Sequence, residues 1–552
     1  MTGMLGRQIR HDLVGLWRTP VVVFFALVFP LAFFVILSGL LGNEPIDTRS
    51  GVRLSQFLAP AFAAFGIAMS TYAFLAIGFA EIRFSGVLKR YTGGPVPRWV
   101  LLGGRVGAGT LVSLASVVLL VAVGAALYEV SVPWSRVPAI VLTCVVAAVS
   151  FSALGLAVAA LAPSFQAATA IANGTVIPLA FVSDLFLVGE LPRWLEAIGW
   201  FFPLKHLVNA LGDAFNPFVE GSGLFVDHLA VIVAWGAFGA LLAAWAIRRD
   251  TARAERGSPA DDGSRPQSTA GTTGGKDAEP RRHGRPGAPA LVADQVRHGT
   301  TLQLRDWSSP LFGVAMPVLL VLLIPTAFAG ADAALRGEIA QTIAATMTIY
   351  GAGIIAYVNM PSGIADAREA GVLKRWAGTP LPTWAILAGR TVSAAVLALL
   401  LWAIAYAVAV PVYGVTVPSS WPSALLVLLV STAAFSALGM GIVTVVRGAQ
   451  AGLAVCLGSL ITLSFISDVF IVGADFPPWL DAISWTFPLR HAVTAFADAL
   501  AADASGVVLG WDHLAVVAAW GLLGVVVVLT RFTAEPRTKS RTPDEAEVAL
   551  TG

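Results

Sequence analysis

Charged residues are scarce in this 552-residue chain: only 12% are Asp, Glu, Lys or Arg, whereas soluble proteins contain about 25%. Hydrophobic residues make up 57%, and the mean hydropathy is +0.78. Apolar runs long enough to cross about 30 Å of hydrocarbon recur along the chain. The composition therefore excludes an array of soluble domains and indicates a polytopic, all-α membrane protein.

The sequence also lacks the usual marks of an enzyme or a metal protein. Its two cysteines, Cys144 and Cys456, lie in apolar runs, so they form no disulfide framework and no CxxC pattern. None of the seven histidines occurs in an HExxH motif. The stretch GTTGGKD at 271–277 has neither the glycine spacing of a phosphate loop nor a Ser or Thr after Lys276. We expect no catalytic residue, no metal and no cofactor bound by this chain. The net charge of +2 gives no reason to expect nucleic acid.

Twelve apolar runs are long enough to be membrane spans, and they fall into two sets of six. The N-terminal run follows several arginines, but it is too long for a signal peptide and has no small-residue cleavage site, so we interpret it as a retained span. The predicted spans lie at residues 21–42, 57–80, 106–127, 137–162, 168–189 and 225–247, then at 308–329, 341–364, 392–414, 422–446, 450–473 and 511–532.

The second set of spans repeats the first. QIRH at 8–11 matches QVRH at 295–298, FSALG at 151–155 recurs at 435–439, and FVSDLFLVG at 181–189 answers FISDVFIVG at 465–473. FPLKH and FPLRH, and the two copies of DHLAV, keep the same register, with offsets of 284 to 287 residues. Six spans per unit is an even number, so both units enter the membrane from the same side and are parallel repeats.

The duplication sets the domain boundaries. We predict a first six-helix unit at residues 1–250, a linker at 251–290, a second unit at 291–535 and a disordered tail at 536–552. The linker is rich in Gly, Pro, Ser and Thr with almost no large apolar residue, which is typical of a flexible segment. Outside it, 21 Lys and Arg lie on the side of the termini and seven on the other, which predicts that both termini and the linker are cytoplasmic.

One basic segment is written twice between the second and third spans of each unit. GVLKRYTGGPVPRW at 86–99 and GVLKRWAGTPLPTW at 371–384 are identical at nine of fourteen positions. An acidic residue, a short helix-compatible stretch and then Gly-x-Pro-x-Pro predict one or two helical turns along the membrane surface, ended by proline. Positive-inside loops need no particular residue order, so the repeated order favours binding of a similar partner surface twice. The alternative is a basic loop that contacts only lipid headgroups.

With these motifs in order, the chain resembles the membrane permease of ABC type-2 exporters, the class of daunorubicin- and tetronasin-type resistance pumps, fused in tandem. The stretches LPRWLEAIGWFFPLKHLVNAL at 191–211 and FPPWLDAISWTFPLRHAVTAF at 476–496 match the family's pattern after the fifth helix. The resemblance implies short helices there that re-enter the membrane from outside, an interfacial helix before each first span, and a coupling helix between spans two and three that docks on an ATPase subunit.

The resemblance therefore implies partners: two copies of an ABC ATP-binding subunit, which hold ATP and Mg, one for each coupling segment, with membrane lipid around the chain. The residues that match the coupling segments are Glu81, Arg83, Gly86, Val87, Leu88, Lys89 and Arg90 in unit one, and Asp366, Arg368, Glu369, Gly371, Val372, Leu373, Lys374 and Arg375 in unit two. An Ala/Val/Gly/Arg-rich composition favours a bacterial source, and hence the bacterial cytoplasmic (inner) membrane.

The resemblance also implies a substrate cavity between the units, walled by the second and fifth helices of each. Its aromatic, amide and hydroxyl side chains suit an amphipathic small molecule such as a drug or antibiotic. The candidates are Phe65, Tyr72, Asn173, Phe181, Ser183, Asp184 and Phe186, with Tyr350, Tyr357, Asn359, Phe465, Ser467, Asp468 and Phe470. Each aromatic ring alone is equally consistent with ordinary helix packing.

Asp184 and Asp468 depart from the Ser-Gly pair that many relatives carry late in the fifth helix. They are predicted either to contact a cationic group of the substrate, or to pair with Lys205 and Arg490 as gate elements, or simply to end a helix in water. Two other functions remain open at this level. The chain is alternatively an exporter of cell-envelope lipid or glycan, or a proton-coupled transporter of the major facilitator class, which also has six plus six parallel helices.

Overall fold

The computed structural model describes most of both units, and the regular elements in the part it describes are helices. The described residues are 2–17, 23–40, 43, 52–88, 97–185, 192–256, 288–305, 310–328, 333–377, 382–417, 420–470, 476–501 and 506–532. Most of the predicted linker and all of the predicted tail lie outside these ranges, but residues 251–256 and 288–290 of the linker are helical.

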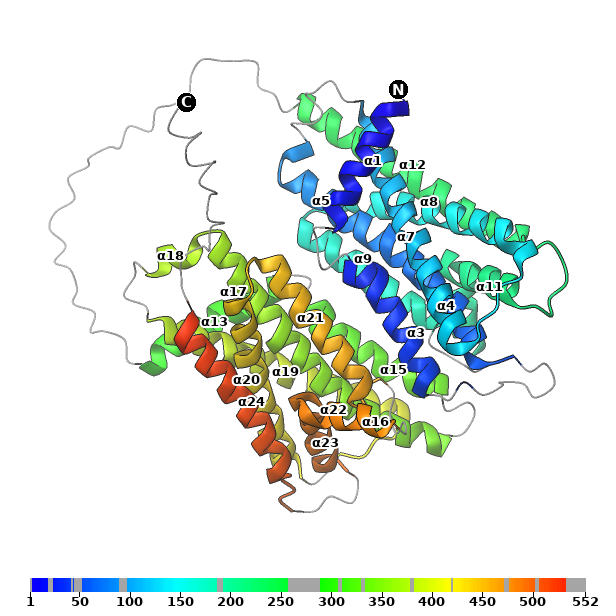
Figure 1. The fold of residues 1–552 in the computed structure, drawn as a ribbon. Helices are drawn as coiled ribbons and strands as arrows, with labels where there is room; N and C mark the ends of the chain where they lie inside the picture. Colours follow the sequence, from blue (N-terminus) through cyan, green and yellow to red (C-terminus); the bar gives the residue numbers. More distant parts are fainter. Residues whose placement is uncertain are drawn as a thin grey trace, which may run out of the picture.

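Each unit folds into its own helical bundle (Figure 1). The first contains α1 (Thr2–Trp17), η1 (Phe24–Val28), α3 (Phe29–Leu40), α4 (Leu54–Ala68), η2 (Met69–Ala73), α5 (Phe74–Phe84), α7 (Arg98–Tyr128), η3 (Trp134–Arg136), α8 (Val137–Leu161), α9 (Phe165–Val182), α10 (Arg193–Phe201), α11 (Pro203–Phe215) and α12 (Val226–Arg256). The second contains α13 (Ala288–Arg305), η4 (Leu311–Ala315), α15 (Met316–Phe328), α16 (Ala333–Gly353), η5 (Ile354–Asn359), α17 (Met360–Glu369), α18 (Val372–Ala377), α19 (Thr383–Tyr413), α20 (Trp421–Val445), α21 (Ala449–Ile466), α22 (Pro478–Thr486), α23 (Pro488–Ala499) and α24 (Trp511–Arg531).

Nine helices in the described residues are long and apolar enough to cross a membrane, and three shorter apolar helices accompany them at Phe24–Gly39, Ala167–Val182 and Leu311–Thr326. Each of the twelve predicted spans overlaps one of these helices. The second span of each unit is longer than predicted: it extends over Leu54–Phe84 and Leu335–Glu369. The charged residues that follow its apolar part therefore belong to the last turns of the same helix.

The described parts of the fifth spans end earlier than predicted, at Val182 and Ile466. The next residues but one, Asp184 and Asp468, have positive φ angles of 60° and 56°. A left-handed residue cannot continue a right-handed helix, and Asp is one of the few side chains that tolerate this conformation. The helices α9 and α21 therefore end here, and the predicted span ends at residues 189 and 473 lie outside the described residues.

A π-helical turn interrupts the second span of each unit at the same place, η2 in one and η5 in the other. The carbonyl groups of Tyr72 and Tyr357 in these turns lie directly against Gly155 and Gly439 of the fourth span, where a Cβ atom would have no room. Both glycines end the repeated FSALG motif. The motif is therefore explained by close packing of the second span on the fourth.

The two bundles meet along a seam formed by α3 and α9 of the first unit with α15 and α21 of the second (Figure 1). The rings of Phe33 and Phe465 lie 3.6 Å apart across it, centroid to centroid. A smaller cluster joins Val182 and Leu195 to Leu323. The seam is an apolar, closely packed contact between the repeats.

Candidate functional site

The end of the second span is fastened to the end of the fourth by an arginine in each unit, half-buried in the first and buried in the second. Arg83 Nη1 donates to the carbonyl oxygens of Ala159 and Ala162, at 3.0 and 2.8 Å. Arg368 Nη2 donates to Val443 O at 2.9 Å, and Arg368 is only 4% exposed. These carbonyls lie at the C-termini of α8 and α20, where the helix leaves acceptors unpaired and negative partial charge accumulates. Arg83 and Arg368, both also predicted to contact a partner, thus connect two helices within their own unit.

A glycine turns the chain from the second span into the following segment. Gly86 and Gly371 have φ angles of +77° and +69°, and a Cβ at either position would meet nothing within 4 Å. The glycines are therefore required by backbone conformation rather than by lack of space. In the second unit Gly371 N donates to Arg368 O at 3.1 Å, which closes the turn before α18.

The short helix α18 confirms that the repeated segment is helical in the second unit, over Val372–Ala377. Leu373 is 5% exposed and belongs to the hydrophobic core, whereas Lys374 and Arg375 are exposed. In the first unit Leu88 packs against a cluster that contains Phe79. The pattern is an apolar anchor with cations outside it. Lys89 and Arg90 lie outside the described residues, while Glu81 and Asp366 are exposed and Val87 and Val372 are half-buried.

Glu369 makes a contact that the first unit does not repeat. Its Oε1 accepts from Ala449 N at 2.6 Å, at the first turn of α21, whose cap residue Gly448 has no side chain to offer. In the first unit Ser164 caps α9 directly, since its Oγ accepts from Ala167 N at 3.0 Å. A carboxylate at a helix N-terminus is favoured by the partial positive charge there. Glu369 thus ties the coupling segment of unit two to the fifth span.

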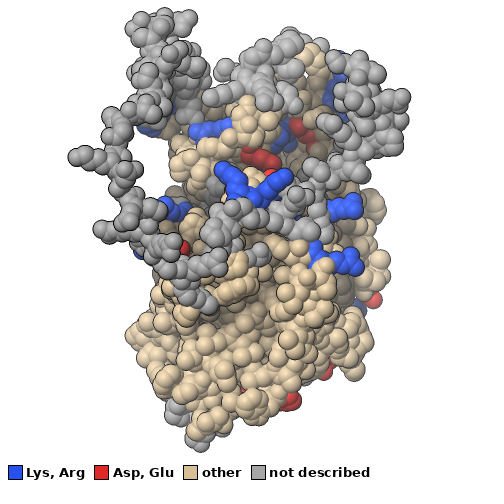
Figure 2. Space-filling model, turned by 90° about the vertical axis from the view of Figure 1, so that its left-hand side faces the viewer, with Lys and Arg blue, Asp and Glu red and all other residues tan. Residues whose placement is uncertain are grey.

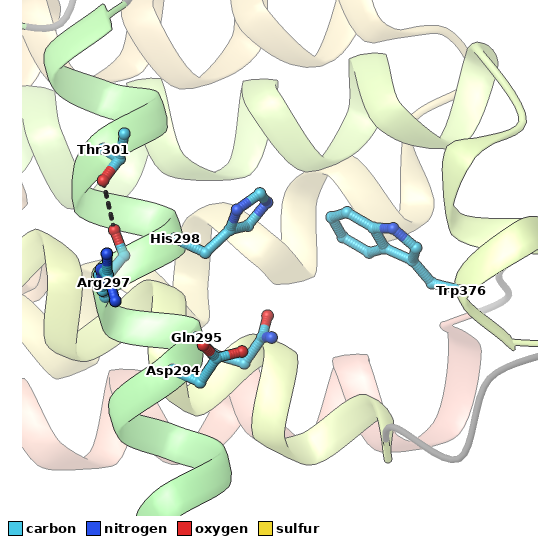
Figure 3. A pocket seen from close by; sticks show the side chains of 6 residues that line it. All are labelled: Asp294, Gln295, Arg297, His298, Thr301 and Trp376. Atoms are coloured by element: carbon cyan, nitrogen blue, oxygen red, sulfur yellow. Dashed lines mark hydrogen bonds between the residues drawn. The ribbon is translucent and has the colours of Figure 1, made fainter. Parts of the chain in front are cut away.

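A groove of about 400 Å³ lies beside α18, between it and α13. His298 and Trp376 point toward one another from its two walls, with ring centroids 6.2 Å apart (Figure 3). α13 is held along α19 by a 2.8 Å hydrogen bond between the hydroxyls of Thr300 and Ser393. Residues of α13 and α18 in the second unit therefore line the same groove. The groove is lined by Asp294, Gln295, Arg297, His298, Thr301 and Trp376.

The charges that the structure describes gather toward one end of the molecule. Figure 2 shows Lys and Arg over the upper part of one face and a nearly uncharged lower part, with a few acidic residues at its far edge. Exposed apolar side chains such as Leu241 and Leu529, on α12 and α24, are 72% and 80% exposed. An uncharged apolar belt beside a basic end is the surface expected of a membrane protein.

Only some of the predicted cavity residues lie at the seam between the two units. Phe465, Phe470 and Tyr350 lie at the seam, with Phe465–Phe470 and Tyr350–Phe470 centroids 4.9 and 5.0 Å apart, and Phe181 packs against the same core. Phe65 is buried inside the first bundle. Asn173 and Asn359 are half-buried, and Phe186 lies outside the described residues. The prediction missed Phe33, although the first span is conspicuously rich in phenylalanine.

Tyr72 and Tyr357 have a role within each unit. The Tyr72 hydroxyl is 2.6 Å from Thr175 Oγ1, and the Tyr357 hydroxyl is 2.8 Å from Ser459 Oγ. Both bonds join the π-helical turn of the second span to the fifth. The second, fourth and fifth spans of each unit are therefore linked by polar contacts as well as by packing.

The acidic residues after the fifth span are paired with cations. Asp184 Oδ2 lies 3.0 Å from Lys205 Nζ, and Asp468 Oδ2 lies 3.2 Å from Arg490 Nη2. The Lys205 side chain is only 3% exposed, and Arg490 has a second carboxylate partner, Asp481, at 2.9 Å. Ser183 and Ser467 are fully buried beside these pairs. Both predicted pairs with Lys205 and Arg490 are therefore present.

Comparison with known proteins gives the same division of the chain. The ABC-2 type transporter family matches residues 7–215 and again residues 296–500. The chain is also similar to "Inner membrane transport permease YadH" of Escherichia coli K12, E. coli O157:H7 and Shigella flexneri, with 24% identity over 211 residues in each case. That similarity covers 37% of this chain and 81% of the relative, as expected when one unit of a tandem pair aligns with a single-unit permease. The chain belongs to the ABC-2 type transporter family, as a membrane transport subunit in which two copies of the family's domain are fused.

Proposed function

We propose that this chain is a membrane-spanning subunit of an ATP-driven exporter in a bacterial inner membrane. It would cross the membrane twelve times with both termini in the cytoplasm, and two ATP-binding subunits with ATP and Mg would dock on the two GVLKR segments. The observation that carries the proposal is α18: an apolar anchor, two exposed cations and a glycine turn, placed directly after the second span.

The contacts around this segment provide a route for transmitting movement. A push on α18 reaches the second span through the turn at Gly371, the fourth span through Arg368, and the fifth through Glu369 and Tyr357. Because the fifth spans line the seam, closure of two docked subunits would alter the contact between the bundles. Nucleotide binding then biases an equilibrium between two arrangements of the seam.

At the opposite end, the Asp184–Lys205 and Asp468–Arg490 pairs would hold the re-entrant helices α11 and α23 against the fifth spans. We assign these pairs to the outer gate. A substrate cation would compete with Lys205 or Arg490 for the carboxylate only after a pair has opened.

For the substrate, we propose an amphipathic drug or antibiotic that enters between the aromatic rings of the seam, near Phe33, Phe465 and Phe470. A cell-envelope lipid or glycan is the alternative. Membership of the ABC-2 family replaces the major facilitator interpretation.

The test is reconstitution of the chain in proteoliposomes with the ATP-binding subunits that its own genome supplies. We expect ATP hydrolysis only when both components are present, and ATP-dependent movement of one class within a panel of amphipathic antibiotics and lipids. Hydrolysis by the chain alone, or transport driven by a proton gradient without ATP, would contradict the proposal. A variant with Lys374→Glu and Arg375→Glu should lose both activities but keep its fold.

A further inference from the structure

Two histidines from different helices face each other in each unit, at the end of the bundle that carries the re-entrant helices. Nδ1 of His206, in the first turn of α11, lies 3.0 Å from Nδ1 of His228, in the first turn of α12. In the second unit the Nδ1 atoms of His491 and His513 are 2.8 Å apart. Figure 1 places α22 and α23 at the opposite end of the second bundle from α18. The same pair therefore occurs twice, with the same atoms in contact.

The surroundings of the pairs are duplicated as well. His206 Nε2 lies 2.9 Å from the carbonyl oxygen of Trp200, and His491 Nε2 lies 2.8 Å from that of Trp485. The same two indole rings stack on His228 and His513, at 5.9 and 5.7 Å. His206 and His491 are each 9% exposed. The exposure of the histidine and its contacts with the tryptophan are the same in both units. The arrangement is therefore a repeated structural feature of the fold.

The hydrogen bonds determine where the protons are. A backbone carbonyl only accepts, so Nε2 of His206 carries a proton, and in the neutral ring its Nδ1 is an acceptor. The Nδ1 of His228 must therefore donate, which leaves its own Nε2 without a proton. That Nε2 lies 4.0 Å from Asp227 Oδ2 in the first unit, whereas in the second unit Asp512 Oδ2 lies 3.9 Å from Nδ1 of His513. The neutral pair shares one proton between the two Nδ1 atoms and has one vacant basic nitrogen.

Protons added to this pair have separable effects. A first proton enters Nε2 of His228, beside Asp227, and leaves the Nδ1–Nδ1 bond intact. A second proton must go to Nδ1 of His206, and then two N–H groups face each other without an acceptor. Both rings would then be positively charged, with their Nδ1 atoms about 3 Å apart. Two like charges this close in a half-buried site are strongly disfavoured. The bond between α11 and α12 is then lost.

The charged groups around each pair come from every neighbouring element. In the first unit these are Glu196 on α10, Lys205 and Asp213 on α11, Asp227 on α12, and Asp184 through Lys205. Their counterparts in the second are Asp481, Arg490, Asp498, Asp512 and Asp468. Burial raises the pKa of Asp213 and of Asp498 above the ordinary value of an aspartate, and the nearby histidine acts in the other direction. The adjacent cation, Lys205 or Arg490, opposes further positive charge on the pair.

We propose that each histidine pair is a proton-binding site that fastens the re-entrant helix to the sixth span and releases it when the pair becomes doubly protonated. The ligand is the proton on the side of the membrane opposite the GVLKR segments. Acidification on that side would free α11 and α23 from α12 and α24, while the Asp184–Lys205 and Asp468–Arg490 contacts remain. The inference goes beyond ATP-driven export and does not require a docked partner, so its failure would leave the proposed function untouched.

The test compares thermal unfolding of the full chain in nanodiscs between pH 8 and pH 4.5. A double variant with His228→Asn and His513→Asn keeps a side-chain N–H near the position of Nδ1, and its amide can turn to offer oxygen if His206 or His491 is protonated. Because release requires the second, disfavoured proton, we expect the wild type to lose several degrees more than this variant when the pH is lowered from 8 to 4.5. A variant with alanine at both positions should be destabilised at every pH.

The matched control replaces two histidines outside the pairs, His11→Asn and His298→Asn, and should follow the wild-type profile. Equal acid sensitivity of the wild type and the His228→Asn, His513→Asn variant would overturn the proposal. If that variant does not fold, hydrogen exchange of the wild type gives the answer: after correction for intrinsic rates, protection of residues 200–212 and 485–497 should fall at least tenfold between pH 7.5 and pH 5. Unchanged protection in both segments would overturn the proposal.

Discussion

Gly371 offers a sharp test of how the coupling segment is presented, because its substitution changes the backbone and nothing else. The residue has φ +69°, and a Cβ there would touch no atom within 4 Å. A non-glycine residue in this conformation costs about 1–3 kcal/mol. Asn tolerates the left-handed region and should lie at the low end, whereas a β-branched residue such as Val should lie at the high end.

The strain at this turn should be relieved by a change in the direction of α18. If only the native direction docks, the apparent dissociation constant of an ATP-binding subunit rises in inverse proportion to the population that keeps this direction. A cost of about 1–3 kcal/mol corresponds to roughly a 5- to 150-fold loss of affinity. We therefore expect the affinity for the ATP-binding subunit to fall from the wild type to Gly371→Asn and further to Gly371→Val. The affinities are measured by biolayer interferometry on the chain in nanodiscs, with the other site blocked by Gly86→Val.

The matched control is Gly414, which ends α19 with the same φ of +69° and also has open space around it. Gly414→Val should cost a similar free energy of unfolding in mixed micelles but leave the affinity for the ATP-binding subunit unchanged. Equal affinities for Gly371→Asn, Gly371→Val and the wild type would refute the reasoning, as would an equal loss of affinity in Gly414→Val.

Three further pairs of substitutions test the contacts inside the bundles. Gly155→Ala and Gly439→Ala place a Cβ against the carbonyl of a π-helical turn and should each lower the free energy of unfolding by about 1–3 kcal/mol; no change in either would contradict the packing of the second span on the fourth. Asp184→Asn leaves the buried Lys205 ammonium without its carboxylate and should cost about 3 kcal/mol, whereas Asp468→Asn should cost less because Arg490 keeps Asp481; equal losses would argue against these pairs. Arg136→Met removes a 7% exposed guanidinium that donates to Asp213 O and Asn216 O and should cost about 1.5–3 kcal/mol, while Arg53→Met, which breaks a surface pair with Glu129, should cost less than about 1 kcal/mol; a larger loss for Arg53→Met would reverse the expected order.

Features that depend on local composition and on the repeat were predictable from the sequence. The positions of the twelve apolar runs and the division of the chain follow from hydropathy and from the offsets between repeated motifs. The pairing of Asp184 with Lys205 was also within reach, since opposite charges occur in the same two stretches of both units.

Features that depend on contacts between distant helices were not predictable in the same way. Arg83 and Arg368 sit in a basic segment and read as surface cations, yet they bond to helix ends about 75–80 residues away. The π-helical turns have no sequence signal of their own. The repeated glycine of FSALG indicated only that another chain segment packs closely there. The histidine pairs do have a sequence signal, which is the equal spacing of two histidines in both repeats. His206 and His228 are 22 residues apart, and so are His491 and His513.

The most direct measurement is site-specific photo-cross-linking from position 375, on the exposed face of α18, in cells that produce the chain together with its ATP-binding subunits. We predict an adduct between this position and the ATP-binding subunit, and no such adduct from position 241 on the lipid-facing surface of α12. A complex that hydrolyses ATP and exports substrate while position 375 yields no adduct with that subunit would contradict the docking of the ATP-binding subunit on the repeated basic segment.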